Sequence, residues 1–216
     1  MWKKIWAMLL LCAFMLSMVG CGSNTTALND VQVDMQNENR TLDEANQITA
    51  ELSYPIFSDH SGDGKADNML AELNAQIQNN IDAFLQQAAN AQPGDIFACQ
   101  NEVVYNNNGL VSIVERQNLA GEYRQYAATY SLQNGKKATL GELLDKKESQ
   151  AEELVLQQLG GVIQSDPNTF HSDAADYVQN NLDKLQYYRS SEGLAVFFQA
   201  GEIAPESVGV IEIVIQ

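Results

Sequence analysis

The ten residues from Ser58 to Asp67, SDHSGDGKAD, form the densest cluster of acidic and glycine residues in the chain. Oxygen ligands at this spacing, with a glycine at the sixth position, are typical of a calcium loop of the EF-hand kind. Starting at Asp59, the ligand positions hold Asp59, Ser61, Asp63, Lys65 through its carbonyl group, and Asp67. Gly64 takes the sixth position, but the twelfth, where a bidentate acid belongs, is Leu70.

Two interpretations of this segment remain open. Without the twelfth ligand the loop would bind calcium weakly, as extracellular sites do at millimolar concentration. In the other interpretation the segment is a polar turn in which glycines let the chain reverse and Asp67 caps the next helix. A strand, rather than an entering helix, is predicted before the segment. This favours the turn, so we predict no metal ligand here.

Residues that support catalysis are otherwise sparse. The two histidines, His60 and His171, lie far apart and lack a metal-binding spacing such as HExxH. There is no Gly-x-Ser-x-Gly elbow, and Cys99 has no evident histidine partner. Two carboxylates can hydrolyse a glycosidic bond, but nothing singles out a pair among the 28 acidic residues. We therefore expect neither enzymatic activity nor a cofactor.

The first residues predict export and a lipid anchor. Lys3 and Lys4 precede an apolar run from Ile5 to Met18, which is shorter than the roughly 20 residues of a membrane span. Cys21 follows Val-Gly, as in a bacterial lipobox. We predict a signal peptide over residues 1–20, acylation of Cys21 and a position on the outer face of the bacterial cytoplasmic membrane. The alternative is an ordinary signal peptide that happens to contain Cys21.

Charge is the strongest signal in the composition. Without Lys3 and Lys4 the mature chain has 10 basic and 28 acidic residues, a net charge of −18 with histidine neutral. Such a chain repels nucleic acid and anionic lipid and attracts a cationic partner from a distance. The alternative is that acidity only keeps an exported protein soluble. Cys99, in the apolar stretch IFACQ, is predicted to be a buried thiol.

Hydrophobic patterning separates a tether from a domain. Residues 21–45 are polar and contain no aromatic residue, so we predict a flexible tether there. A folded domain is predicted from 46 to 216. It begins with alternating apolar residues over Ile48–Tyr54, which predict a strand, and continues with three- and four-residue spacing over Met69–Ala88, which predicts a helix.

The rest of this domain alternates between strands and helices. The predicted elements are a hairpin over 102–115 that turns at Asn-Asn-Asn-Gly, a strand over 126–132, a helix with a capping box at Ser149 and Glu152 that is limited by Gly160-Gly161 and Pro167, a helix over 172–185, and strands at GLAVFFQ and VGVIEIVIQ. Antiparallel strands with inserted helices predict a single α+β domain, an antiparallel sheet packed with several helices and without a second core.

Three stretches occur in the order and spacing of a bacterial extracytoplasmic module. They are YNNNGLVSIV, YAATYSLQNGKKATLGELL and EGLAVFFQAGEIAPESVGVIEIVI. On these stretches the sequence resembles the extracellular domain of the RsiV-type anti-sigma factors, which also occurs beside peptidoglycan deacetylase domains and in small lipoproteins. The resemblance covers Ile48 to Gln216 and is most specific in FFQAGEIAP and the strand at Gly209.

The resemblance implies a binding domain. In the anti-sigma members the module is a receptor for lysozyme, and beside deacetylases it is thought to contact the cell wall or assist the enzyme. The sequence contains neither a sigma-binding segment before a transmembrane helix nor a deacetylase domain, so we expect binding without signal transfer by that route. Many members carry a Gly-Gly-Ala-His loop after the first hairpin. Here the sequence is NLAGEYRQYAA, without histidine, and no ligand role carries over.

We therefore predict a membrane-anchored binding or sensing module that captures lysozyme or another cationic protein. The alternative is an accessory role in binding or remodelling cell-wall polysaccharide, with peptidoglycan as the partner. The candidate contact loop runs from Gln199 to Ser207, because it joins two strands and holds Glu202 and Pro205 in a turn. In the alternative, structural interpretation, the loop is only a connection of fixed shape that buries Ile203.

Overall fold

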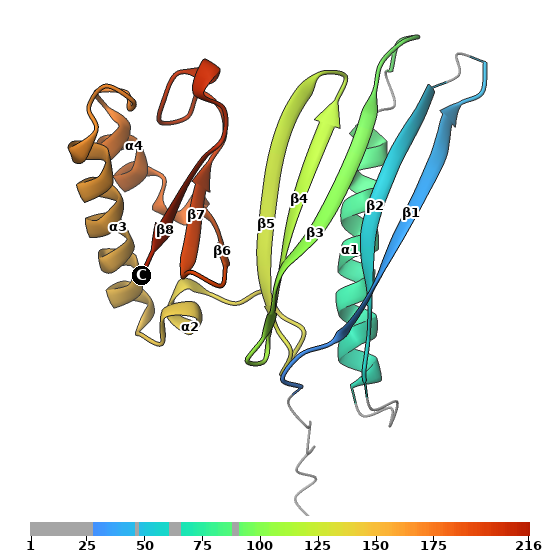
Figure 1. The fold of residues 1–216 in the computed structure, drawn as a ribbon, viewed down its shortest axis with the longest axis horizontal. Helices are drawn as coiled ribbons and strands as arrows, with labels where there is room; N and C mark the ends of the chain where they lie inside the picture. The colour runs from blue at the N-terminus through green and yellow to red at the C-terminus, as the bar shows by residue number, and fades with distance from the viewer. Residues whose placement is uncertain (1–27, 46–47, 61–65, 88–90) are drawn as a thin grey trace, which may run out of the picture.

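The computed structural model describes residues 28–45, 48–60, 66–87 and 91–216 (Figure 1). Its first half forms a five-stranded sheet with one helix. The elements are β1 (Gln32–Asp43), β2 (Ile48–Ser58), α1 (Asp67–Gln87), β3 (Phe97–Asn107), β4 (Leu110–Leu119) and β5 (Glu122–Ser131). The predicted signal peptide and Cys21 lie outside the described residues. Within them, no helix combines the length and apolar character of a membrane span.

The strands of this sheet follow one another in chain order, β1-β2-β3-β4-β5. Neighbours are antiparallel except for β2 and β3, which are parallel because α1 forms the crossover between them. The predicted hairpin is confirmed as β3 and β4. Its turn residues Asn108 and Gly109 have φ values of 52° and 74°, the left-handed conformation that a two-residue turn requires.

The second half forms a smaller sheet with its own helices. Its elements are α2 (Leu140–Leu144), α3 (Glu148–Ser165), α4 (Ala174–Asn180), β6 (Gln186–Arg189), β7 (Leu194–Phe198) and β8 (Ile211–Ile215), with single 3-10 turns at Leu182–Lys184 and Glu206–Val208. The three strands are antiparallel in the order β6-β7-β8. In Figure 1, α3 and α4 cover the side of this sheet that lies away from β5.

Three hydrophobic clusters hold the layers together. One lies between α1 and the five-stranded sheet, and one lies between the small sheet and the helices α2 to α4. A third, smaller cluster joins the two sheets through Val114, Ala127, Tyr188, Ala195 and Phe197. The predicted α+β single domain is confirmed. It contains two sheets in place of one antiparallel sheet, and each sheet has its own core.

The predicted tether is wrong over residues 32–43, which form β1. This strand pairs with β2 from Gln32 to Asp43 along the edge of the sheet. An edge strand is held by backbone hydrogen bonds on one side and needs few buried side chains, so a polar composition does not exclude it. The folded part therefore begins before residue 46, and Val31 is already buried in the α1 cluster.

Two helix boundaries also differ from the prediction. The N-cap of α3 is Lys147, without a side-chain cap, and the helix continues through Gly160-Gly161 to Ser165. Its apolar stripe packs on the small sheet, which outweighs the helix cost of two glycines, about 1 kcal/mol each. A capping box does occur at the start of α2, between Thr139 and Glu142. Asp67 lies in the first turn of α1 and is not its cap.

Candidate functional site

The predicted contact loop after β7 is fixed to the rest of the domain by its own side chains. The backbone nitrogen of Gln125 on β5 donates to Gln199 Oε1 at 3.0 Å, and Gln199 Nε2 donates to the Gln125 carbonyl group. The backbone nitrogen of Gln199 donates to Glu202 Oε2 at 2.7 Å. Ile203 is fully buried, as the structural interpretation predicts, and Pro205 is exposed. Partner binding by this loop stays a prediction.

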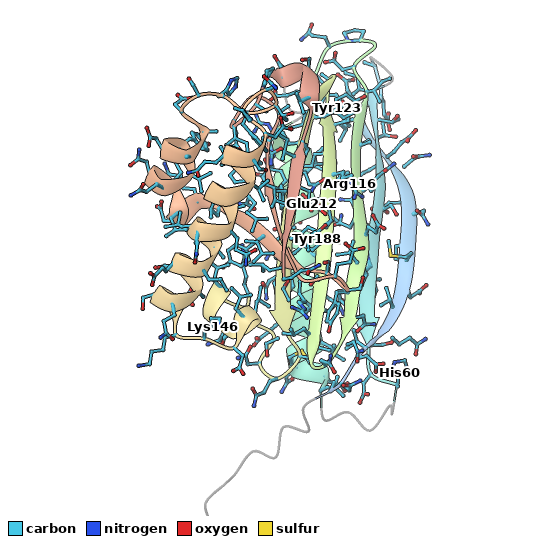
Figure 2. All side chains as sticks on the ribbon, turned by 60° about the vertical axis from the view of Figure 1, so that its left-hand side comes forward. His60, Arg116, Tyr123, Lys146, Tyr188 and Glu212 are labelled. Atoms are coloured by element: carbon cyan, nitrogen blue, oxygen red, sulfur yellow. The ribbon has the colours of Figure 1, made fainter. Side chains whose placement is uncertain are left out.

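The predicted calcium loop falls mainly on residues 61–65, which lie outside the described residues. Figure 2 shows His60, just before that gap, at the end of the molecule where the described chain begins. Its Nε2 atom lies 3.4 Å from Asp30 Oδ1. The described residues contain no group of three or more histidine, cysteine, aspartate or glutamate side chains placed to hold a metal ion. Calcium binding by Asp59, Ser61, Asp63 and Asp67 is therefore untested.

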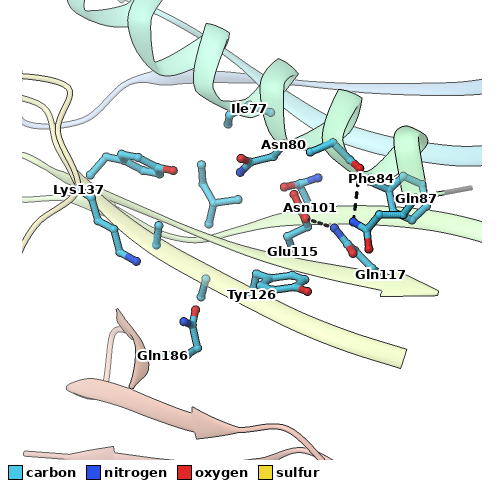
Figure 3. A pocket seen from close by; sticks show the side chains of 15 residues that line it. Ile77, Asn80, Phe84, Gln87, Asn101, Glu115, Gln117, Tyr126, Lys137 and Gln186 are labelled. Atoms are coloured by element: carbon cyan, nitrogen blue, oxygen red, sulfur yellow. Dashed lines mark hydrogen bonds between the residues drawn. The ribbon is translucent and has the colours of Figure 1, made fainter. Parts of the chain in front are cut away.

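A pocket that the sequence analysis did not anticipate opens between α1 and the β4–β5 part of the large sheet (Figure 3). Its volume is about 390 Å³. A helix is about 10 Å wide and strands are about 4.8 Å apart, so one helix covers only two or three of five strands. Because α1 packs mainly on β2, the far part of the sheet is left partly uncovered.

Three polar side chains form the floor of this pocket. Asn101 on β3 and Glu115 and Gln117 on β4 are 6%, 6% and 5% exposed. Successive side chains of a strand point to opposite faces, so Glu115 and Gln117 share the α1 face of β4 with the core residue Ile113. On this face of β4, polar side chains thus follow core residues: Val111 and Ile113 come first, and Glu115 and Gln117 take the next two positions.

The hydrogen bonds of the floor are incomplete. Gln117 Nε2 donates to Glu115 Oε1 at 2.6 Å, and Asn101 Nδ2 donates to the Ser53 carbonyl group at 3.3 Å. Glu115 Oε2 and Gln117 Oε1 are buried without any hydrogen-bond partner. An unsatisfied buried polar atom costs about 1–3 kcal/mol, and in a native protein it calls for an explanation. Two free acceptors in a pocket match a ligand that brings donors.

Burial also changes the acidity of these groups. Loss of solvent raises the pKa of the Glu115 carboxyl, and its polar neighbours Gln117, Cys99 and Asn101 offset part of this rise. The neighbouring Cys99 thiol is fully buried, as predicted, and its pKa is raised first by burial and then by Glu115. Burial and Glu115 likewise raise the pKa of Tyr130. Cys99 therefore stays a thiol and is no nucleophile at neutral pH.

The walls and rim complete the pocket. Ile77, Ala83 and Phe84 of α1 supply apolar wall, and the exposed amides of Asn80 and Gln87 lie above it on the same helix (Figure 3).

On the opposite side lie the aromatic side chains of β5 and two polar rim residues. Tyr126 is 37% exposed, Tyr130 is buried, and Lys137 and Gln186 lie at the rim. Gln186 belongs to β6, so the small sheet also contributes to the pocket. This set of amides, one carboxylate and two tyrosines can bind a polar ligand with apolar faces.

One signal in the sequence pointed to this floor. Val111 and Ile113 alternate in step with Glu115 and Gln117, so a strand that buries the first pair also places the second pair on the core side. The hairpin prediction ended at Glu115 and did not extend the alternation. Nothing local identified Asn101 or the residues of α1 as their neighbours.

Comparison with known proteins places the fold. The chain is similar to a DUF3298 family member from Bacteroides fragilis NCTC 9343, with a TM-score of 0.52 and 16% identity over 88% of this chain and 91% of that one. It is also similar to a DUF3298 family protein from Pseudomonas aeruginosa PAO1, with a TM-score of 0.55 and 14% identity over 88% and 92%. No family model and no curated protein matches the sequence.

The class of protein that follows is an α+β domain with the fold of DUF3298 proteins, a domain of unknown function. At these identities the likeness extends to the fold alone.

Proposed function

We propose that this protein is a lipid-anchored, extracytoplasmic binding module whose ligand is a saccharide of the cell envelope, held in the pocket between α1 and β5. The observation that carries the proposal is the pair of buried acceptors without partners, Glu115 Oε2 and Gln117 Oε1, on the floor of a pocket. Among the functions that the sequence predicts, this corresponds to the binding of cell-wall polysaccharide.

The chemistry of the lining supports a saccharide. Sugar rings carry many hydroxyl donors, which suit the free acceptors of the floor, and the amides of Asn80, Gln87 and Gln186 can bond hydroxyl groups at the rim. The face of Tyr126 offers an apolar surface to the C–H side of a sugar ring. A volume of about 390 Å³ lies within the range of ligand sites, about 300–1,000 Å³.

The proposal is of binding and not of hydrolysis. Glycoside hydrolysis uses two carboxyl groups, about 5 to 10 Å apart, on either side of the bond that is cleaved. Among the residues described as lining the pocket, Glu115 is the single carboxylate. The pocket can therefore hold and orient a saccharide without the second group that cleavage needs.

The test is a titration followed by nuclear magnetic resonance. A soluble chain that starts at residue 22 retains every described element and is titrated with tri-N-acetylglucosamine. We expect the side-chain amide signals of Asn101 and Gln117 to shift, and Gln117→Ala to weaken binding. Gln133→Ala, an exposed glutamine in a turn outside the pocket, is the matched control. Absence of any shift at millimolar sugar would contradict the proposal.

A second candidate, capture of a cationic protein such as lysozyme, is favoured by the net charge of −18 that the mature sequence predicts. Its test is calorimetric titration with hen lysozyme at low and high salt. Glu202→Lys and Glu206→Lys make the same charge change in one loop, but only Glu202 bonds the backbone of Gln199. A larger loss with Glu202→Lys identifies a specific contact. Equal losses indicate long-range attraction alone.

A further inference from the structure

We propose that the pocket recognises a protonated amine, with Glu115 as its counter-ion and Gln117 as a second acceptor. The inference rests on the proposed function, because it names the saccharide class as one that carries a free amino group. It follows from the number of open acceptors on the floor and from the charge that the floor leaves uncompensated.

The two open oxygens belong to one hydrogen-bonded unit. Gln117 uses its Nε2 donor on Glu115 Oε1, which leaves the carbonyl oxygen of its amide for a ligand. Glu115 keeps its second carboxylate oxygen open beside it. A ligand must therefore bring at least two donors to this place. An ammonium group has three donors, whereas a hydroxyl group has one.

The unpaired charge of Glu115 also favours an ammonium group over a hydroxyl group. A buried carboxylate is stable as an ion only when it is paired, and the floor contains no cation to pair with it. The one basic residue among the described lining residues is Lys137, which is exposed and lies with its Nζ atom 5.9 Å from the centre of the Tyr187 ring. Burial accordingly raises the pKa of Glu115. An entering ammonium group supplies the missing charge and both missing donors together.

The remaining side chains of the floor fit this assignment. Asn101 donates its amide to the Ser53 carbonyl group, and the Cys99 thiol is buried beside it. Neither brings a positive charge to Glu115. Ile77 and Phe84 exclude water from the α1 side, which strengthens the attraction between a carboxylate and an ammonium group.

The experiment compares two trimers that differ only in the amino group, tri-glucosamine and tri-N-acetylglucosamine. They are titrated by calorimetry into the soluble chain in high salt, which suppresses attraction to the acidic surface. We expect the free amine to bind at least tenfold more tightly. Glu115→Gln is expected to abolish this preference and to retain binding of the N-acetyl trimer. Glu122→Gln, which removes an exposed charge from β5, is expected to keep it.

The outcomes separate the two proposals. Equal binding of both trimers overturns the amine assignment and leaves the saccharide proposal standing. Binding of neither trimer overturns the proposed function and this inference with it. A preference that survives Glu115→Gln shows that surface charge attracts the amine, which also overturns the assignment. Because Glu115→Gln changes one atom, folding is checked by its spectrum, and amine-induced shifts of Gln117 in the unsubstituted chain give an independent readout.

Discussion

The strands β4 and β7 each pair with a neighbouring strand on both sides, yet only β7 is apolar throughout. All five residues of β7, Leu194–Phe198, are buried and hydrophobic, and alternate residues contribute to the helix cluster and to the cluster between the sheets. In β4, Val111 and Ile113 join the α1 cluster, but Glu115 and Gln117 on the same face are polar and equally buried.

The difference follows from how completely each sheet is covered. Three helices pack on a sheet of three short strands, so β7 meets apolar side chains on both faces. One helix packs on a sheet of five long strands, so the end of β4 faces a pocket. A pocket has formed where the sheet is wider than its helix, and polar side chains replace core residues there.

The largest effect is expected from the apolar strand. Phe198→Ala removes a buried ring from the helix-covered core of the small sheet and should lower the free energy of unfolding by about 3–5 kcal/mol. Urea denaturation measures this change. The saccharide affinity of the folded protein should stay the same, because Phe198 does not line the pocket. A loss below about 1 kcal/mol would show that β7 is less important to the core than its burial implies.

Substitutions of the polar residues of β4 are expected to change stability less and to abolish saccharide binding. Replacing Glu115 and Gln117 together by methionine removes both unsatisfied acceptors and should leave the free energy of unfolding unchanged or raise it by about 1 kcal/mol. Gln117→Met alone takes away the hydrogen bond to Glu115 and should cost about 1–3 kcal/mol. If the double variant is the less stable of the two, the polar pair is structural and the comparison with β7 fails.

The pH dependence of stability should distinguish the two strands further. The pKa of Glu115 is raised above 4.5 in the folded protein, so the folded state binds this proton more tightly than the unfolded state. The contribution of Glu115 to stability is therefore greatest at low pH and is lost as pH rises from 4.5 through the folded pKa.

Glu115→Gln removes this term, so its stability relative to the unsubstituted protein should rise over the same interval and then level off. Urea denaturation from about pH 4 to about pH 8 measures the difference. Phe198→Ala carries no ionisable change and should show a constant difference. A difference for Glu115→Gln that does not change with pH would contradict the burial of its charge.

The smallest effect is expected on the other face of β4. Arg116 Nη1 lies 2.8 Å from Glu102 Oε2, and both side chains are more than half exposed, at 53% and 58%. Figure 2 shows Arg116 on the surface of the large sheet. Arg116→Ala should lower the free energy of unfolding by less than about 0.5 kcal/mol, because exposed ion pairs contribute little. A loss several times larger would show that the pair of Arg116 and Glu102 is less exposed in solution than in the structure.

Local sequence was sufficient for the elements whose cause is local. The turn at Asn108 and Gly109 needs two residues that tolerate positive φ, and the strand at Ile48 shows its burial as simple alternation. The edge strand β1 and the four-residue β6 were missed. Hydrogen bonds to their pairing partners, β2 and β7, hold these two strands in place. No hydrophobic pattern within β1 or β6 predicts a strand.

By itself, the sequence determined the α+β class, the hairpin, α1 and the apolar strands β7 and β8. In these elements the spacing of apolar residues along a short stretch shows which side chains are buried. The tertiary structure alone decided that α1 leaves β4 and β5 partly uncovered, and that Asn101 lies beside Glu115 and Gln117. The physical reason is that a pocket depends on the width of a sheet relative to its helix. That width is set by the pairing of five separate strands, which no single stretch of the sequence determines.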